Sequence, residues 1–191
     1  PGAWSVLPDL SYLEGKADRI IGCITTHSHE DHIGALPMIL RDYEFPIYGS
    51  PFTLGMVTNK LSEANLMHRT ELRPVEDGQR LKIGSFDCEF LPVTHSVPSG
   101  LITAIHSKQG VILHSSDFKL DLNPVDGRHT DLARIGALSD NPGIRLLLCD
   151  STNSDIPGSS QSEPDDRQGS RARDAPGVRP PRSEPAGRRL G

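Results

Sequence analysis

Three histidines and two acidic residues lie close together in the run from His27 to His32, which reads HSHEDH. Side chains two residues apart in an extended segment point to the same side, so His27 and His29 can bind one metal ion at the end of a strand. The chain then turns, and Asp31 and His32 can face a neighbouring ion. Imidazole and carboxylate suit zinc and similar ions. A second ion nearby would make hydroxide available near neutral pH, which is the two-metal route to hydrolysis.

A histidine-rich surface loop is the alternative interpretation of this run. It fits poorly, because the run directly follows the apolar segment Arg19–Thr26, which we expect to be a short buried strand. Three of the chain's eight histidines within this one run also exceed what random scatter would give. The run therefore predicts a metal site.

A closed site needs ligands from elsewhere in the chain. His95 follows the strand-like segment Phe90–Thr94, and Asp117 follows the strand-like segment Val111–His114. Sites in layered sheet proteins usually form where strands deliver their last residues to loops. Taken alone, each would be interpreted as a turn residue, but beside the first cluster both are predicted ligands.

The remaining histidines are weaker candidates. His114 precedes Asp117 at strand spacing, so that orienting a ligand and packing in the core are both open for it. His68, His106 and His129 are predicted to be surface or turn residues.

The elements that must position these residues alternate between strands and helices, which predicts layered α/β packing with a mixed sheet. Ser50 is a predicted N-cap, followed by proline at the first helical position. The predicted strands are Arg19–Thr26, Pro46–Gly49, Arg80–Gly84, Phe86–Val93, Leu101–His106, Val111–His114 and a buried Ile144–Asp150, the middle four forming two hairpins; the predicted helices are Ile33–Arg41, Pro51–Ala64 and Thr130–Leu138.

Composition divides the 191 residues into two parts. Residues 159–191 contain Val178 and Leu190 as their only large aliphatic residues, which is too little apolar surface to offset the entropy of ordering, so we expect a disordered low-complexity tail. Residues 1–158 can form a core. The net charge of −5 argues against a basic nucleic-acid clamp, so that a nucleic-acid substrate must be argued from the site.

Cysteine usage and hydropathy are informative about the setting. Cys23, Cys88 and Cys149 form no paired framework, which predicts small buried residues in a reducing interior. No run is long or apolar enough to span a membrane. The chain opens with Pro1 rather than Met, so we expect that a true N-terminus is missing.

The run His27 to His32 matches the HxHxDH signature of the metallo-β-lactamase superfamily, and its context resembles the ribonuclease J family within the β-CASP branch. The likeness extends from residue 8 to about residue 158, in order and without large gaps. The segments that carry it are Thr26–Pro37, Thr94–Pro98, His114–Asp121, Pro124–Gly127 and Cys149–Asn153.

The resemblance implies a metallo-β-lactamase αββα sandwich, partial in this chain, with catalytic roles for Asp31, His32 and Asp117. It implies that one Zn²⁺ is held by His27, His29 and His95, that a second is held by Asp31 and His32, and that Asp117 bridges both; Mn²⁺ could replace zinc. The activity implied is a ribonuclease, both endonuclease and 5′-to-3′ exonuclease, which uses the hydroxide between the metals in mRNA decay and rRNA maturation. RNA as partner, a cytoplasmic location, no membrane and a homo-oligomeric full-length enzyme follow from the same resemblance.

The chain departs from this family in three places. Strands that normally precede Pro8 are missing. Ser116 stands where the family's turn usually carries glycine, and serine is strained at positive φ. After Gly158 the expected β-CASP pattern gives way to the tail, for which a frameshifted translation and a genuine disordered linker are both open.

These departures affect the activity that we expect of this chain. The family's last ligand to the second zinc, a distant histidine, has no counterpart, so we expect an under-coordinated second site and weak or absent activity of this chain alone. Two other interpretations stay open. One is a small-molecule hydrolase such as a thioesterase or lactonase on the same scaffold, and the other is an inactive, truncated fragment that binds metal without turnover.

Overall fold

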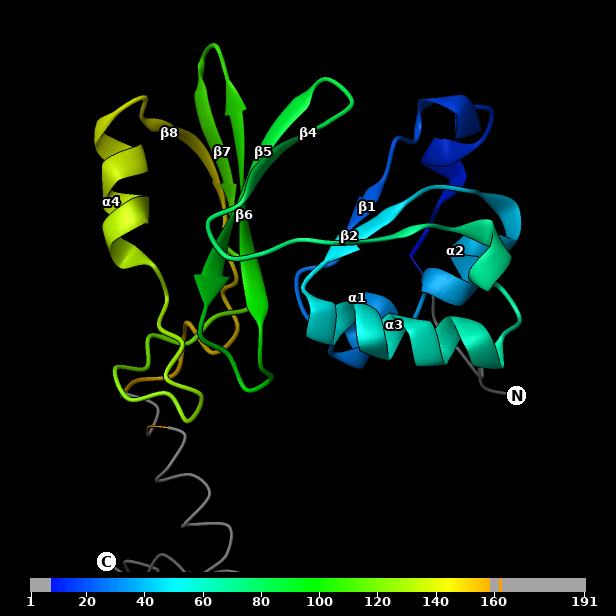
Figure 1. The fold of residues 1–191 in the computed structure, drawn as a ribbon. Coiled ribbons are helices and arrows are strands. Elements are labelled where there is room, and N and C mark those ends of the chain that lie inside the picture. Colours follow the sequence, from blue (N-terminus) through cyan, green and yellow to red (C-terminus); the bar gives the residue numbers. More distant parts are fainter. Residues whose placement is uncertain (1–7, 159–161, 163–191) are drawn as a thin grey trace, which may run out of the picture.

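Two sheets lie face to face between helices (Figure 1). The structure is a computed structural model, and it describes residues 8–158 and residue 162. Along one direction the order is helix α4, a five-stranded sheet, a three-stranded sheet, and helices α1 to α3. This helix–sheet–sheet–helix order confirms the predicted α/β class and the αββα sandwich. The expectations about strands before Pro8 and about the tail 159–191 concern residues outside those described, Ser162 apart.

The three-stranded sheet is parallel and carries the histidine run at one end. Strand β1 (Cys23–Ile24) pairs with β2 (Ile47–Gly49), which pairs with β3 (Leu72–Pro74). Parallel neighbours need crossover connections, and helices provide them here. Only two residues of the predicted strand 19–26 form a ladder. Its first residue, Arg19, instead ends the 3-10 turn Ala17–Arg19.

Helices α1 (Glu30–Ile33), α2 (Leu36–Asp42) and α3 (Pro51–Glu63) cover the outer face of this sheet. The predicted single helix over 33–41 is in fact the last residue of α1 and most of α2, separated by Gly34 and Ala35. The N-cap prediction for α3 is confirmed, because the Ser50 hydroxyl accepts a hydrogen bond from the Thr53 amide at 3.3 Å. Short 3-10 turns at Ser11–Leu13 and Met67–Arg69 complete this half.

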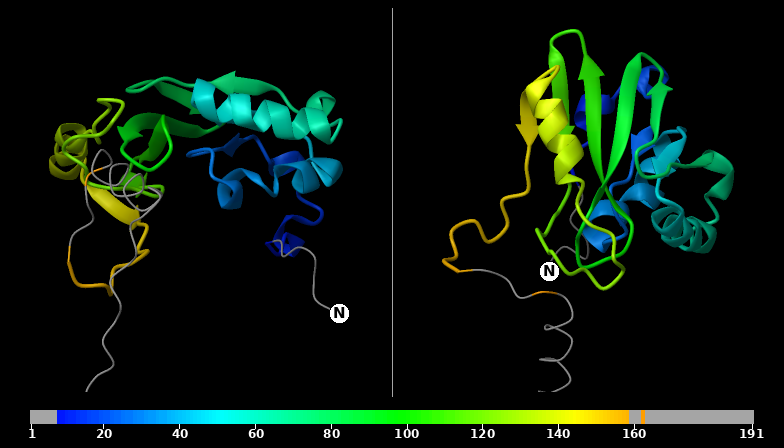
Figure 2. Two further views of the ribbon diagram at one scale, coloured as in Figure 1. Left: turned by 90° about the horizontal axis from the view of Figure 1, so that it is seen from below. Right: turned by 60° about the vertical axis from the view of Figure 1, so that its left-hand side comes forward.

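The five-stranded sheet is mixed, as predicted. It contains, in order, β4 (Arg80–Ile83), β5 (Phe86–Val93), β6 (Gly100–Ser107), β7 (Gly110–His114) and β8 (Ile144–Leu148). The first four are antiparallel and include both predicted hairpins, whereas β8 runs parallel to β7. Helix α4 (Leu132–Asp140) lies against this sheet, as the right-hand view of Figure 2 shows.

Three apolar clusters hold the four layers together. One joins α1–α3 to the three-stranded sheet, and another joins α4 to the five-stranded sheet. The third lies between the sheets and includes Tyr48, Val75, Ile83, Phe90 and Leu101. Period-two alternation along β5 explains the division, since Phe90 faces the other sheet while Leu91 faces α4. The two sheets are therefore fixed relative to each other by a continuous core.

Two predictions of burial are wrong. Strand β8 was expected to be buried, but Leu146, Leu147 and Leu148 are about half exposed, because β8 is the edge strand and pairs only with β7 among the described residues. Cys149, expected to be a small buried residue, is exposed just beyond this edge, whereas Cys88 is buried and Cys23 partly so. None of the helices formed by residues 8–158 is both long and apolar enough to cross a membrane.

A buried ion-pair cluster fixes α4 to the five-stranded sheet. The buried Glu89 carboxylate on β5 accepts a hydrogen bond from Arg134 Nε of α4 at 2.6 Å and lies 2.7 Å from His106 Nε2. The Arg134 guanidinium holds the pKa of Glu89 below its usual range. His106 is the penultimate residue of β6 and its side chain is 10% exposed and paired with Glu89, so its prediction as a surface or turn residue is wrong.

Replacing Thr103 by valine is expected to stabilise the protein by roughly 1 kcal/mol. The Thr103 side chain lies on β6 and is buried, and its hydroxyl has no hydrogen-bond partner among the described residues. A buried hydroxyl without a partner costs desolvation, which a methyl group of similar size does not. Urea unfolding of the Thr103→Val chain measures the difference. A lower midpoint would mean that the hydroxyl makes a hydrogen bond in solution.

Candidate metal centre

The two sheets bring the predicted ligands together at one end. His27 and His29 follow β1, His95 follows β5, and Asp117 follows β7. One backbone hydrogen bond joins the two sheets here, from the Leu101 amide at the start of β6 to the Thr26 carbonyl, at 2.9 Å. Another, from the Lys119 amide to the Thr94 carbonyl at 2.8 Å, ties the loop of Asp117 to that of His95. The backbone thus fixes the three loops that carry the site.

Three imidazole nitrogens converge on one point. His29 Nδ1 lies 3.0 Å from His27 Nε2 and 3.1 Å from His95 Nε2. The three rings meet edge to face, so their nitrogen lone pairs rather than their faces are directed inward. Together with Asp117 these atoms form a group whose ligand atoms all lie within 4.8 Å of one another. Such a set of three imidazoles and a carboxylate fits a tetrahedral zinc ion or a similar cation.

Asp117 lies between this group and a second one. Its Oδ2 is 3.7 Å from His27 Nε2 and 3.3 Å from His32 Nε2. The second group consists of Asp31, His32 and Asp117, and the Asp31 carboxylate is 3.5 Å from the His32 ring. All six side chains predicted from the sequence are thus side by side. Their roles as ligands stay a prediction, while their convergence is a property of the fold.

The two groups differ in burial and in number of donors. His27 is fully buried, and His29, His95 and Asp117 are partly buried, whereas the Asp31 side chain is 78% exposed. The first group offers four donors and the second three, one of which is shared. The described residues therefore form one largely enclosed group of potential ligands and one open group.

Burial also favours the neutral form of His27 and His95. Desolvation, followed by the neighbouring His32 and His95 rings, lowers the pKa of His27 to about 4. Desolvation likewise lowers the pKa of His95, with His29 as the next cause. A neutral imidazole is the form that binds a metal ion, so the site is prepared for a cation near neutral pH.

We expect the metal-free protein to lose stability as the pH falls from about 6.5 to about 4. Between these values the unfolded chain takes up a proton at His27 while the folded chain does not. The free energy of unfolding therefore has its full value above pH 6.5 and declines below it. The loss attributable to this histidine is on the order of 3 kcal/mol. Urea unfolding at several pH values measures it, and a His27→Gln chain should show a shallower slope. Equal slopes for the two chains would contradict a depressed pKa.

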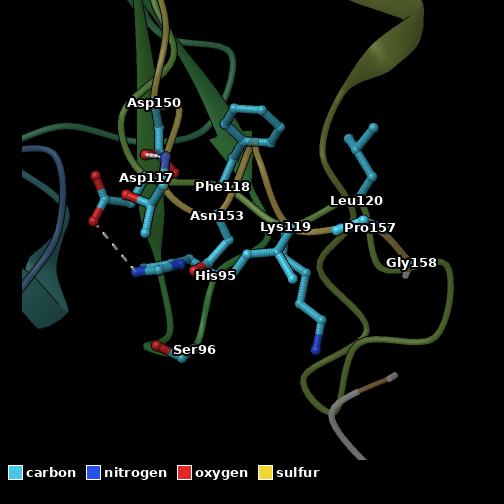
Figure 3. Close-up of a pocket in the computed structure, with 12 residues that line it drawn as sticks. His95, Ser96, Asp117, Phe118, Lys119, Leu120, Asp150, Asn153, Pro157 and Gly158 are labelled. Atoms are coloured by element: carbon cyan, nitrogen blue, oxygen red, sulfur yellow. Dashed lines mark hydrogen bonds and ion pairs between the residues drawn. The ribbon is translucent and has the colours of Figure 1, made fainter. Parts of the chain in front are cut away.

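A cavity opens beside the enclosed group. It has a volume of about 660 Å³, and Figure 3 shows His95 and Asp117 on one side of it with Lys119 on another. Asp150, which follows β8, also lines it, and hydrogen bonding from Thr152 holds the pKa of this carboxyl below its usual range. A smaller hollow that also borders Asp117 is lined by His32, His114, Leu147 and Leu148. A substrate could therefore reach the enclosed group from the larger cavity.

Sequence reasoning missed the hydroxyls around the histidines. Ser96 Oγ lies 3.2 Å from His29 Nε2, and Thr26 and Ser116 contact His27 Nδ1. Each is a chain neighbour of a predicted ligand, which was the available signal. His114 is exposed and is not part of the core; the role of orienting a ligand stays untested for it. His68 and His129 are exposed, as predicted.

Comparisons with known proteins agree with this geometry. A family model described as "Beta-lactamase superfamily domain" matches residues 6–133. A Ribonuclease J of Mycolicibacterium smegmatis is 44% identical over 164 residues, which are 85% of this chain and 29% of that protein. A Ribonuclease J of Helicobacter pylori is 42% identical over 159 residues, 83% of this chain and 23% of that protein.

Among solved structures, a protein of unknown function from Enterococcus faecalis has a TM-score of 0.51 at 15% identity, covering 74% of this chain and 34% of that one. At this identity the likeness concerns the fold alone. The chain spans less than a third of the length of the two ribonucleases it matches.

Proposed function

The chain belongs to the beta-lactamase superfamily, and from this premise we propose that it carries the metal centre of a ribonuclease of the J type. The observation that carries the proposal is the shared position of Asp117 between a group of three histidines and a second group of Asp31 and His32. This arrangement occurs within a sequence more than 40% identical to two proteins named Ribonuclease J.

The donor set fits zinc, although manganese could also bind. His27, His29 and His95 would hold one ion, Asp31 and His32 the second, and Asp117 both. Two bound cations supply positive charge beside a phosphodiester and a water molecule of lowered pKa near neutral pH. The neutral state of His27 and His95 favours binding of the ions, and burial of His27 excludes solvent from the inner side of the site.

An RNA phosphodiester is the proposed substrate, cut internally or from the 5′ end, in mRNA decay and rRNA maturation. The cavity of about 660 Å³ beside His95 and Asp117 gives room for a substrate next to the donors, and Lys119 adds a cation to its lining. The chain's overall charge of −5 does not oppose this, because the ions themselves would neutralise the scissile phosphate. An RNA substrate is consistent with a cytoplasmic location. We propose that the full-length family enzyme is a homo-oligomer.

One observation favours a second candidate, an inactive metal-binding fragment. The second group has only three donors among the described residues, and the Asp31 side chain is largely exposed. The apolar edge strand β8 is also uncovered among the described residues. We therefore propose that residues 1–158 form the metal-binding unit, that residues 159–191 take no part in it, and that this chain alone turns over RNA weakly or not at all.

Metal content and RNA cleavage, measured on the same preparation, test the proposal. We expect one tightly bound zinc per chain and a second bound weakly, with cleavage of 5′-monophosphorylated RNA at most slow. Turnover of thioesters or lactones without cleavage of RNA would favour a small-molecule hydrolase instead. A chain that binds no zinc would overturn the metal centre.

A further inference from the structure

The buried ring of His27 has two different sides. Its Nε2 faces inward, toward His29 Nδ1 at 3.0 Å and the Asp117 carboxylate at 3.7 Å. Its Nδ1 faces away from them, toward two hydroxyls, Thr26 Oγ1 at 3.1 Å and Ser116 Oγ at 3.2 Å. A neutral imidazole carries one proton, and the nitrogen without it is the one that can bind a cation.

Ser116 differs from Thr26 in where it comes from. Thr26 is the chain neighbour of His27, whereas Ser116 lies 89 residues away, on the loop after β7, directly before Asp117. Its side chain is buried, and its backbone has φ of 61°, a left-handed conformation that a serine adopts only at a cost. A non-glycine residue is thus held in strain at the point where two loops of the site meet.

The turn around Ser116 is also fixed from the other side. The Ser115 hydroxyl donates to the Ser116 carbonyl at 2.7 Å and accepts from the Asp150 amide at 3.1 Å. The Ser116 hydroxyl itself lies 3.2 Å from His27 Nδ1. The contacts of Ser115 thus hold the backbone from which the Ser116 side chain reaches the ring.

We propose that Ser116 is a positioning residue for the metal centre, whose hydroxyl accepts a hydrogen bond from Nδ1–H of His27 and keeps Nε2 free toward the cation. This proposal rests on the proposed metal centre and adds to it a coupling between the orientations of His27 and Asp117. The same residue sets the backbone that presents Asp117 and the tautomer of His27, so that ligands from the two sheets are oriented together. Partners that orient a metal-binding histidine contribute about 10- to 100-fold to affinity.

Two substitutions separate the hydroxyl from the backbone conformation. Ser116→Ala removes the hydroxyl and keeps the strain, whereas Ser116→Gly removes both. We expect each to weaken zinc binding by about 10- to 100-fold in a chelator competition. The glycine chain should have the higher unfolding midpoint of the two without metal. If Ser116→Gly bound zinc as tightly as the original chain, the hydroxyl would have no part in binding and the proposal would be overturned.

A spectroscopic measurement tests the tautomer directly. In the metal-free, ¹⁵N-histidine-labelled chain near pH 7.5, we expect His27 to carry its proton on Nδ1, and the Ser116→Ala chain to shift population toward the Nε2-protonated form. The His27→Gln chain identifies the signals. A proton already on Nε2 in the original chain, or no change on substitution, would overturn the proposal.

The matched control is Thr103→Val, which also removes a buried hydroxyl but lies outside both metal groups. It should leave zinc affinity and the His27 signals unchanged, and an equal loss of affinity there would mean that any buried hydroxyl gives the effect. If the original chain binds no zinc, the proposed metal centre fails, while the ring signals still decide the role of Ser116.

Discussion

An Asp117→Ala chain is expected to lose both bound metal ions, whereas other single substitutions in the site should affect only one. Asp117 is the one residue common to both donor groups, with its Oδ2 3.3 Å from His32 Nε2 and 3.8 Å from His95 Nε2. Its removal leaves three imidazoles in the first group and a single carboxylate and imidazole in the second. We expect affinity for the tighter ion to fall more than ~100-fold, since even residues that only orient a ligand contribute about 10- to 100-fold.

The pattern across variants distinguishes the two sites. His95→Ala should weaken the tighter ion and spare the weaker one, because His95 belongs to the first group alone. Asp31→Ala should do the reverse. Zinc titration with a chromophoric chelator, together with the zinc content after dialysis, gives the two affinities. Any residual RNA cleavage should disappear in Asp117→Ala.

Glu30→Gln is the matched control for this series. Glu30 lies within the same histidine run but belongs to neither donor group, and its exposed carboxylate pairs with Lys60 Nζ at 2.7 Å. Both affinities should be unchanged in this chain. Loss of one ion only in Asp117→Ala would contradict a shared carboxylate, and loss of zinc in Glu30→Gln would point to a general effect of charge.

Most of the candidate site could be predicted from the sequence, because its residues are either close together in the chain or close to the ends of strands. The run from His27 to His32 places four donors between the end of β1 and the end of helix α1, and His95 and Asp117 each stand within three residues of a strand end. The strain at Ser116 was also predicted, because the family that the sequence resembles carries glycine at this position. The contact of its hydroxyl with His27 was not predictable, since it depends on how two sheets meet across 89 residues.

The fold was predictable where the pattern is local, and the prediction failed where burial depends on distant parts of the chain. Both hairpins and the N-cap at Ser50 follow from residue type and alternation. The run Leu146–Leu148 reads as buried by hydropathy alone, yet its exposure depends on what pairs with the free edge of β8. Strand β3, only three residues long, gave no periodic signal at all.

Replacing Phe90 by alanine is expected to cost about 3–5 kcal/mol of unfolding free energy. Phe90 is 0% exposed and belongs to the cluster between the two sheets, with Tyr48 from the three-stranded sheet and Leu101 from its own. Removing the ring leaves a cavity in the only core that holds the sheets to each other among the described clusters. Since domains of this size are stable by about 5–15 kcal/mol, a large part of the protein's stability would be lost.

The consequence should reach the metal centre, because its donors come from both sheets. His27 and His29 follow a strand of one sheet, and His95 and Asp117 follow strands of the other, so a bound ion joins the two. Zinc that binds only the folded state raises stability by mass action, and saturating zinc should therefore recover part of the loss in Phe90→Ala. Urea unfolding with and without zinc measures both effects.

Phe86→Ala is the control on the same strand: Phe86 is 51% exposed, so its removal should change stability by less than ~1 kcal/mol. Equal losses in the two chains would mean that the core between the sheets does not hold them together.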